Sequence, residues 1–249
     1  MKKLSTIILL LCAINAFSQE ADKKKKKGED LPPEASTFQV QLHQDNGFGF
    51  YPKIKASIGL DYNKSLTLNA SMFSNPILAT GSNNSQRGAD LWLETGIGFS
   101  TSFFKKTLYV NPSLNLVSGK YLNGKNGLLA EGIAPSLHAT YQKKALDIEI
   151  LGTAYINLRT FSSGVNNDYL WVQLYPGLKI NKWLTIGAHY EEFRVVHPND
   201  VNMYRWAGGF LKFTIGDKYN MRFMGGKNFN DNKLYAGEYY RFSTIIPLM

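Results

Sequence analysis

Residues 53–72 read KIKASIGLDYNKSLTLNASM, and apolar and polar side chains alternate along both halves of this stretch. A period of two places successive side chains on opposite faces of an extended strand. The segment therefore predicts two strands, each with one apolar and one polar face, joined by a tight turn at Asn63-Lys64. The apolar face carries Ile54, Ala56, Ile58, Leu60 and Tyr62 before the turn and Leu66, Leu68, Ala70 and Met72 after it.

The same alternation continues to the end of the chain, and no stretch shows a comparable helical period. We therefore predict an all-β protein with about twelve strands. The predicted strands cover residues 37–44, 52–62, 65–73, 89–104, 107–117, 132–142, 145–159, 168–180, 183–192, 203–215, 218–226 and 234–248.

Short and long connections between these strands alternate strictly. The tight turns are predicted at Asn63-Lys64, Lys105-Lys106, Lys143-Lys144, Asn181-Lys182 and Gly216-Asp217, and the long loops near 45–51, 74–88, 118–131, 160–167, 193–202 and 227–233. All short turns then lie at one end of the sheet and all long loops at the other. An even number of antiparallel strands with this arrangement is typical of a transmembrane barrel, which closes because unpaired backbone groups are costly in lipid. A soluble sandwich is the alternative, but its connections need not sort by length.

In these features residues 37–249 resemble the small, porin-like outer-membrane β-barrel proteins of Gram-negative bacteria. The resemblance is architectural and identifies no specific family. It implies an up-and-down barrel of about twelve strands with short periplasmic turns and long extracellular loops. It also implies outer-membrane lipid or lipopolysaccharide and the barrel assembly machinery as partners. One departure is the end of the chain, residues 244–249, which lacks the usual terminal aromatic residue and suggests a variant assembly signal.

The first 36 residues predict export followed by a tail. Lys2 and Lys3 precede an apolar stretch that ends in Ala16-Phe17-Ser18, which is the pattern of a cleaved signal peptide over residues 1–18. Residues 19–36 are rich in lysine and proline and predict a disordered periplasmic tail. The run Lys23–Lys27 is interpreted as a solvated spacer, with contact to an acidic polymer or to lipid headgroups as the alternative.

The charge distribution argues against nucleic-acid binding. The formal net charge is +9, but seven lysines lie in the signal peptide and in the Lys23–Lys27 run. The rest of the chain carries 21 basic and 19 acidic residues. A protein that neutralises phosphates needs a basic surface on its folded domain, and this distribution does not supply one.

If the apolar faces contact lipid, the polar faces line the lumen. The candidate pore-lining residues are Lys55, Glu94, Glu149, Arg159, Lys212, Arg222 and Arg241. The two signs are nearly balanced among the luminal charges, which indicates either paired networks that stiffen the barrel or a weakly selective pore. Gly96, Gly98, Ser100 and Ser102 leave one strand of the wall nearly bare, either as room for a solute or an inserted loop or for close packing of the long Arg and Tyr side chains opposite. An open lumen at the level of Glu94 and Arg222 would favour a channel.

Barrel hydrolases place a histidine and a serine two residues apart on one strand face, where the base can reach the nucleophile. No His-x-Ser occurs, and His138-x-Thr140 is the nearest arrangement. The sequence therefore predicts no enzyme, and no cofactor or metal. The expected function is passive passage of small solutes across the outer membrane. The alternative is a closed structural or surface-interaction barrel acting through loops 74–88 and 118–131, with a hydrolase a distant third.

Overall fold

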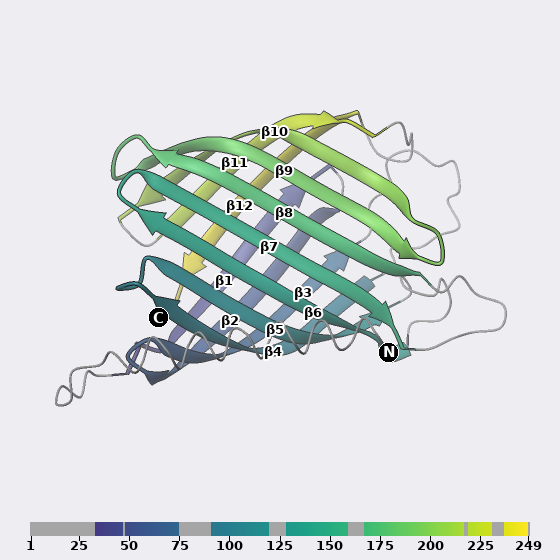
Figure 1. Cartoon of the computed structure of the whole chain (residues 1–249), viewed down its shortest axis with the longest axis horizontal. Coiled ribbons are helices and arrows are strands. Elements are labelled where there is room, and N and C mark those ends of the chain that lie inside the picture. The colour runs from purple at the N-terminus through teal and green to yellow at the C-terminus, as the bar shows by residue number, and fades with distance from the viewer. Residues whose placement is uncertain are drawn as a thin grey trace.

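The computed structural model describes residues 33–46, 48–74, 91–119, 128–158, 167–216, 219–230 and 237–248. The strands are β1 (Thr37–Asp45), β2 (Gly49–Asp61), β3 (Lys64–Ser74), β4 (Leu91–Phe103), β5 (Leu108–Gly119), β6 (Leu128–Lys143), β7 (Leu146–Asn157), β8 (Asp168–Lys179), β9 (Leu184–His197), β10 (Val201–Ile215), β11 (Tyr219–Asn228) and β12 (Glu238–Pro247). Each strand pairs with its neighbours in sequence, and β1 pairs with β12 to close the barrel (Figure 1). The predicted all-β barrel is confirmed.

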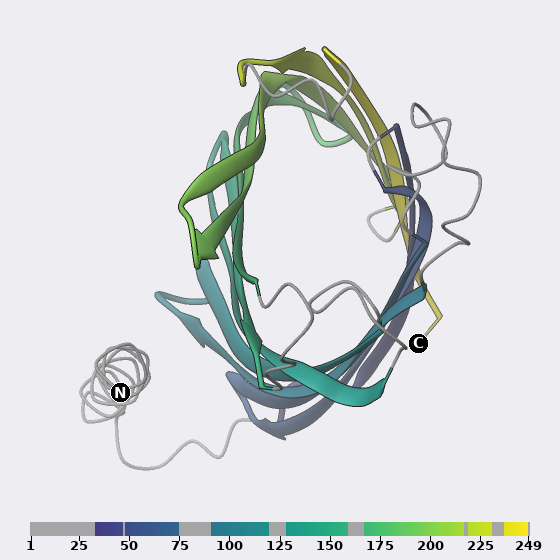
Figure 2. The same ribbon diagram turned by 90° about the vertical axis from the view of Figure 1, so that its right-hand side faces the viewer.

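The seam between the first and last strands is fully paired. The antiparallel register of β1 and β12 runs from Gln39 opposite Pro247 to Asp45 opposite Arg241. Closure leaves no exposed sheet edge, so the backbone groups of every strand find partners within the wall. Seen end on, the wall forms an oval ring (Figure 2). Within the described residues, no helix is long and apolar enough to cross a bilayer.

The predicted strands match the observed ones to within a few residues, but two predicted long loops are wrong. The β1–β2 and β9–β10 connections contain only residues 46–48 and 198–200. The Gly, Asn and Asp composition there is that of a turn, and composition does not report the length of a connection. Strand β9 continues to His197, five residues beyond its predicted end.

Several predictions fall on residues that the structure does not describe. They are the signal peptide 1–18, most of the tail 19–36, most of the loops 74–88 and 118–131, and the candidate Arg159.

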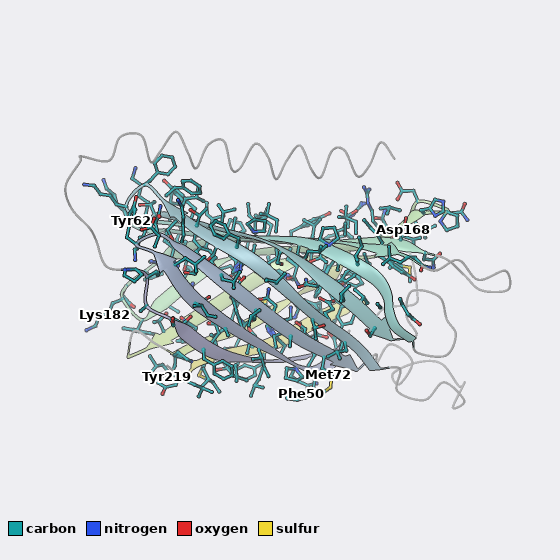
Figure 3. The ribbon with its side chains drawn as sticks, turned by 90° about the horizontal axis from the view of Figure 1, so that it is seen from below. Phe50, Tyr62, Met72, Asp168, Lys182 and Tyr219 are labelled. Carbon is teal, nitrogen blue, oxygen red and sulfur yellow. The ribbon has the colours of Figure 1, made fainter. Side chains whose placement is uncertain are left out.

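The apolar side chains face outward, as the alternation predicts. The exposed large apolar residues include Ile54, Ile58, Leu60, Leu68, Met72, Ile97, Leu114, Leu116, Ile150, Leu211 and Phe223. Tyr62, Lys182 and Tyr219 lie near the short-turn end, with Asp168 at the opposite end (Figure 3). An apolar outer band on a closed barrel is what a lipid environment requires, because the hydrocarbon replaces water as the solvent of that surface.

Candidate functional site

A polar cavity of about 350 Å³ occupies the middle of the lumen and extends toward the short-turn end. Alternation points the polar side of each strand into this space. Six of the seven candidate pore-lining residues line it: Lys55, Glu94, Glu149, Lys212, Arg222 and Arg241. The space at the level of Glu94 and Arg222 is therefore open, and what bounds it determines whether a solute can pass.

Two ion pairs join β7 to β10 and β11 across the cavity. The Lys212 ammonium group donates to Asp147, and the Arg222 guanidinium group donates to Glu149. The Arg222 guanidinium carbon also lies 4.5 Å from the centre of the Tyr175 ring. His138 Nε2 lies 3.2 Å from Glu149 Oε1. These contacts confirm paired charges on this side of the lumen and hold its side chains in place.

Arg241 forms a second network at the level above. Its Nη1 and Nη2 atoms donate to the two oxygens of Glu191 at 2.9 and 3.1 Å, and its Nε donates to Asp45 Oδ2 at 2.9 Å. The Arg241 side chain is 2% exposed, and those of Glu191 and Asp45 are fully buried. Because Asp45 and Arg241 face each other across the β1–β12 seam, one residue ties this seam to β9.

Glu191 accepts further hydrogen bonds from its neighbours. Trp171 Nε1 donates at 2.9 Å, the Tyr204 hydroxyl at 2.7 Å and Gln173 Nε2 at 2.8 Å. A buried ion pair is stable only when such additional hydrogen bonds satisfy its remaining lone pairs, because desolvation of the two charges is costly. The donors come from β8 and β10, so together with Asp45, Glu191 and Arg241 the network spans five strands, β1, β8, β9, β10 and β12.

Above this network, an aromatic layer fills the long-loop half of the lumen. Its members are Phe48, Tyr51, Phe73, Tyr155, Tyr169, Trp171, Phe193, Tyr204, Trp206 and Tyr239. Several of these aromatic residues fall on the polar phase of their strands, which the alternation alone would assign to the lumen. A space of about 10 Å³, the room of about one water molecule, lies among Phe48, Phe73, Tyr155, Trp171 and Phe193.

Phe48 lies at the centre of the aromatic layer, although it belongs to the short β1–β2 connection. Its ring centre lies 6.2 Å from that of Phe73 on β3 and 5.6 Å from that of Trp171 on β8. These strands belong to opposite walls of the barrel, since β3 and β8 are five positions apart in a ring of twelve. Among the described residues, the aromatic layer therefore closes the lumen on the long-loop side.

The Phe48 backbone is fixed by the charged network beneath it. Its amide N–H donates to Asp45 Oδ1, while Asp45 Oδ2 accepts from Arg241. Because Arg241 is held in turn by Glu191, a continuous set of contacts connects the ring that closes the lumen to the buried ion pair.

Lys53 is a luminal cation that is missing from the predicted pore-lining residues. It has the same phase as Lys55 on β2, so the period of two was sufficient to find it. Its Nζ lies 5.6 Å from the centre of the Tyr51 ring and 5.4 Å from the centres of both Phe73 and Trp171. Lys53 therefore occupies the boundary between the cavity and the aromatic layer.

The nearly bare wall at Gly96 and Gly98 is covered by neighbouring polar side chains. A Cβ atom at Gly96 would lie 2.0 Å from Asn115 Oδ1, and one at Gly98 would lie 2.7 Å from the side-chain amide of Asn111. The glycines therefore let amides from β5 lie across β4. They leave no empty space for a solute, and long side chains from the opposite wall do not pack against them.

Two other features are relevant as alternative sites, a metal-binding cluster and a groove on the barrel wall. No group of three or more His, Cys, Asp or Glu residues in the described part of the chain is arranged to hold a metal. A larger groove of about 840 Å³ lies over β7–β11, and its lining residues carry no charge. It therefore suits an apolar neighbour, and the luminal cavity remains the candidate site for a polar solute.

The chain belongs to a family of unknown function (DUF6733), whose model matches residues 1–248. A search of the curated proteins found no match. The barrel is similar to the COG4313 outer membrane channel from Pseudomonas putida F1, with 12% identity, a TM-score of 0.56, and coverage of 90% of this chain and 99% of that one. It is also similar to the NanC porin, with 9% identity, a TM-score of 0.51, and coverage of 83% and 98%. The chain thus shares the fold of outer-membrane channel proteins.

Proposed function

We propose that this member of the DUF6733 family is a passive outer-membrane channel for small polar solutes, closed in this conformation by the aromatic layer. The observation that carries the proposal is the polar cavity of about 350 Å³, which six of the predicted pore-lining residues share. The aromatic layer alone closes the lumen in the described residues. Its central residue, Phe48, belongs to the three-residue connection between β1 and β2.

The location and the partners are part of the same proposal. The apolar outer band would contact outer-membrane lipid, and the assembly machinery would insert the exported chain after removal of residues 1–18. The lysine-rich tail would then lie in the periplasm, beside the short turns. We propose no catalytic role, and passage would follow the concentration gradient of the solute.

Conductance in a planar bilayer tests the channel directly, using mature protein folded in detergent. A heat-modifiable shift on a gel first establishes that the barrel has formed. We expect infrequent but discrete current steps from the wild-type protein, because the aromatic layer must rearrange before ions pass. A folded barrel that never conducts would contradict the proposal.

The second candidate function is a closed barrel that acts through its extracellular loops. The aromatic layer itself favours it, since contacts between opposite walls are what a permanently filled barrel would show. The two functions differ in whether removal of the Phe48 ring produces current.

Arg222 provides a test of whether the cavity lies on the conduction path. We expect Arg222→Glu to shift ion selectivity toward cations, because it replaces a cation with a second carboxylate beside Glu149. Reversal potentials under a salt gradient measure the shift. The double variant Arg222→Glu/Glu149→Arg restores the charge balance and should return selectivity toward the wild-type value. Unchanged selectivity in the single variant would remove Arg222 from the path.

A further inference from the structure

We propose that the luminal cavity binds small hydroxylated organic anions, with Lys53 and Lys55 as the residues that hold the carboxylate. The inference deepens the proposed function, on which it rests for the passage of the bound solute. It concerns the solute class, which neither the fold nor the nearly balanced luminal charge specifies.

The ion pairs around the cavity are unevenly distributed among the strands. Lys212, Arg222 and Arg241 are each bonded to a carboxylate, on the side of the lumen formed by β10, β11 and β12. Within the described residues, no carboxylate lies within ion-pair distance of Lys53 or Lys55. Among the described residues that line the cavity, the two lysines without an ion-pair partner therefore both lie on β2.

The contacts of the two lysines leave their ammonium groups available to a ligand. Lys55 Nζ donates to the Tyr109 hydroxyl at 2.8 Å and, with the Asn111 amide turned to satisfy its neighbours, to Asn111 Oδ1 at 3.1 Å, which leaves one of its three N–H groups for a ligand. Lys53 Nζ lies over the rings of Tyr51, Phe73 and Trp171, and these rings stabilise a cation without neutralising it. Both residues line the cavity, so a carboxylate there could accept hydrogen bonds from either.

Glu94 is the carboxylate that lies nearest to Lys53 when the pairing of β2, β3 and β4 is followed. Lys53 pairs with Ser71, and Ser71 pairs with Glu94, so the two charges lie two strands apart, which is about 10 Å between backbones. Glu94 Oε1 accepts from the Tyr155 hydroxyl at 2.8 Å, which holds the carboxylate on its own side. Removing the Glu94 charge should therefore strengthen anion binding, whereas removing the Lys53 charge should weaken it.

The remaining lining explains why the proposed anion is hydroxylated. Amide and hydroxyl side chains on β1 and β3 line the cavity on both sides of β2, namely Gln39, Gln41, Asn69 and Ser71. Such groups both donate and accept hydrogen bonds, as the hydroxyl groups of a sugar acid require. A purely apolar anion would leave them without partners in the confined space, at a cost for each unsatisfied group.

The test is isothermal titration calorimetry on the folded, detergent-solubilised barrel at low salt. Three open-chain hexose derivatives serve as probes: gluconate, neutral sorbitol and cationic N-methylglucamine. We expect gluconate to bind at least about tenfold more tightly than sorbitol, since hydrogen bonds to charged groups are the stronger ones. N-methylglucamine should bind more weakly still. Equal affinities for the three probes would overturn the proposal.

Variants then assign the site. Lys53→Met should lower gluconate affinity about tenfold, and Glu94→Gln should raise it, while Lys182→Met should leave it unchanged. Lys182 lies on an exposed turn at the barrel end, so its loss changes the net charge equally without touching the cavity (Figure 3). Lys53→Arg and Lys55→Met provide further tests should Lys53→Met fail to fold. If neither lysine affects gluconate binding, the assignment to β2 is wrong.

The titration does not depend on conduction, so the two proposals can fail separately. If the barrel binds gluconate but never conducts, the anion-site proposal is supported and the channel proposal is contradicted. If the barrel conducts but shows no preference for gluconate, the channel proposal is supported and the anion-site proposal is contradicted.

Discussion

Arg241→Ala should destabilise the barrel by about 3–5 kcal/mol, the usual result of removing one partner of a buried ion pair. Glu191 and Asp45 would both lose their cation inside a fully buried network, and the seam between β1 and β12 would lose its link to β9. The measurement is the temperature at which the folded band disappears in the heat-modifiability gel, supported by circular dichroism. We expect a marked decrease for this variant.

Arg205→Ala is the matched control for this prediction. The Arg205 side chain is 42% exposed, and its guanidinium nitrogen lies 3.7 Å from Glu192. Exposed ion pairs contribute about 0–1 kcal/mol, so this variant should unfold close to the wild-type temperature. Equal shifts for Arg205→Ala and Arg241→Ala would show that the loss of an arginine, and not the loss of the buried network, explains the effect.

The strands and their orientation could be predicted from sequence because both follow from a local rule. Period-two alternation depends only on neighbouring residues, so it placed Ile54 and Leu68 outside and Glu94 and Arg222 inside. The barrel followed from the order of the connections. None of these steps required knowing which residues meet across the lumen.

The pairing within the lumen could not be predicted in the same way. Arg241 and Glu191 are 50 positions apart, and the contact depends on the register of four strands and on the barrel's circumference. A near-balance of charges is compatible with many pairings, including none. The concentration of unpaired positive charge at Lys53 and Lys55 therefore emerges only from the three-dimensional arrangement.

Phe48 shows a second limit of sequence reasoning. The segment around it was interpreted as part of a long loop, because Asn46, Gly47 and Gly49 favour irregular backbone. The actual connection is short and is closed by the bond from the Phe48 N–H to Asp45. This turn directs an aromatic ring into the lumen, and its partners come from strands that are distant in sequence.

Phe48→Ala is the change expected to have the largest effect on function. Phe48 contacts rings on both walls, so its removal destabilises the closed aromatic layer without a matching loss in an open state. Replacing a buried phenylalanine by alanine costs about 3–5 kcal/mol, and even 3 kcal/mol would raise the ratio of open to closed barrels about a hundredfold. We expect frequent, long-lived current steps in the planar bilayer.

Phe223→Ala is the control, because it makes the same chemical change on the outward face of β11, where Phe223 is 46% exposed. It should leave the current at the wild-type level. Asp45→Ala should increase current in the same direction as Phe48→Ala, since it frees the Phe48 N–H while Glu191 still binds Arg241. If Phe48→Ala folds and stays silent, the closure does not depend on this ring, and the closed-barrel function becomes the better explanation. If both variants conduct, the buried network that stabilises the barrel also holds the lumen shut, and solute passage is coupled to the contacts of Arg241.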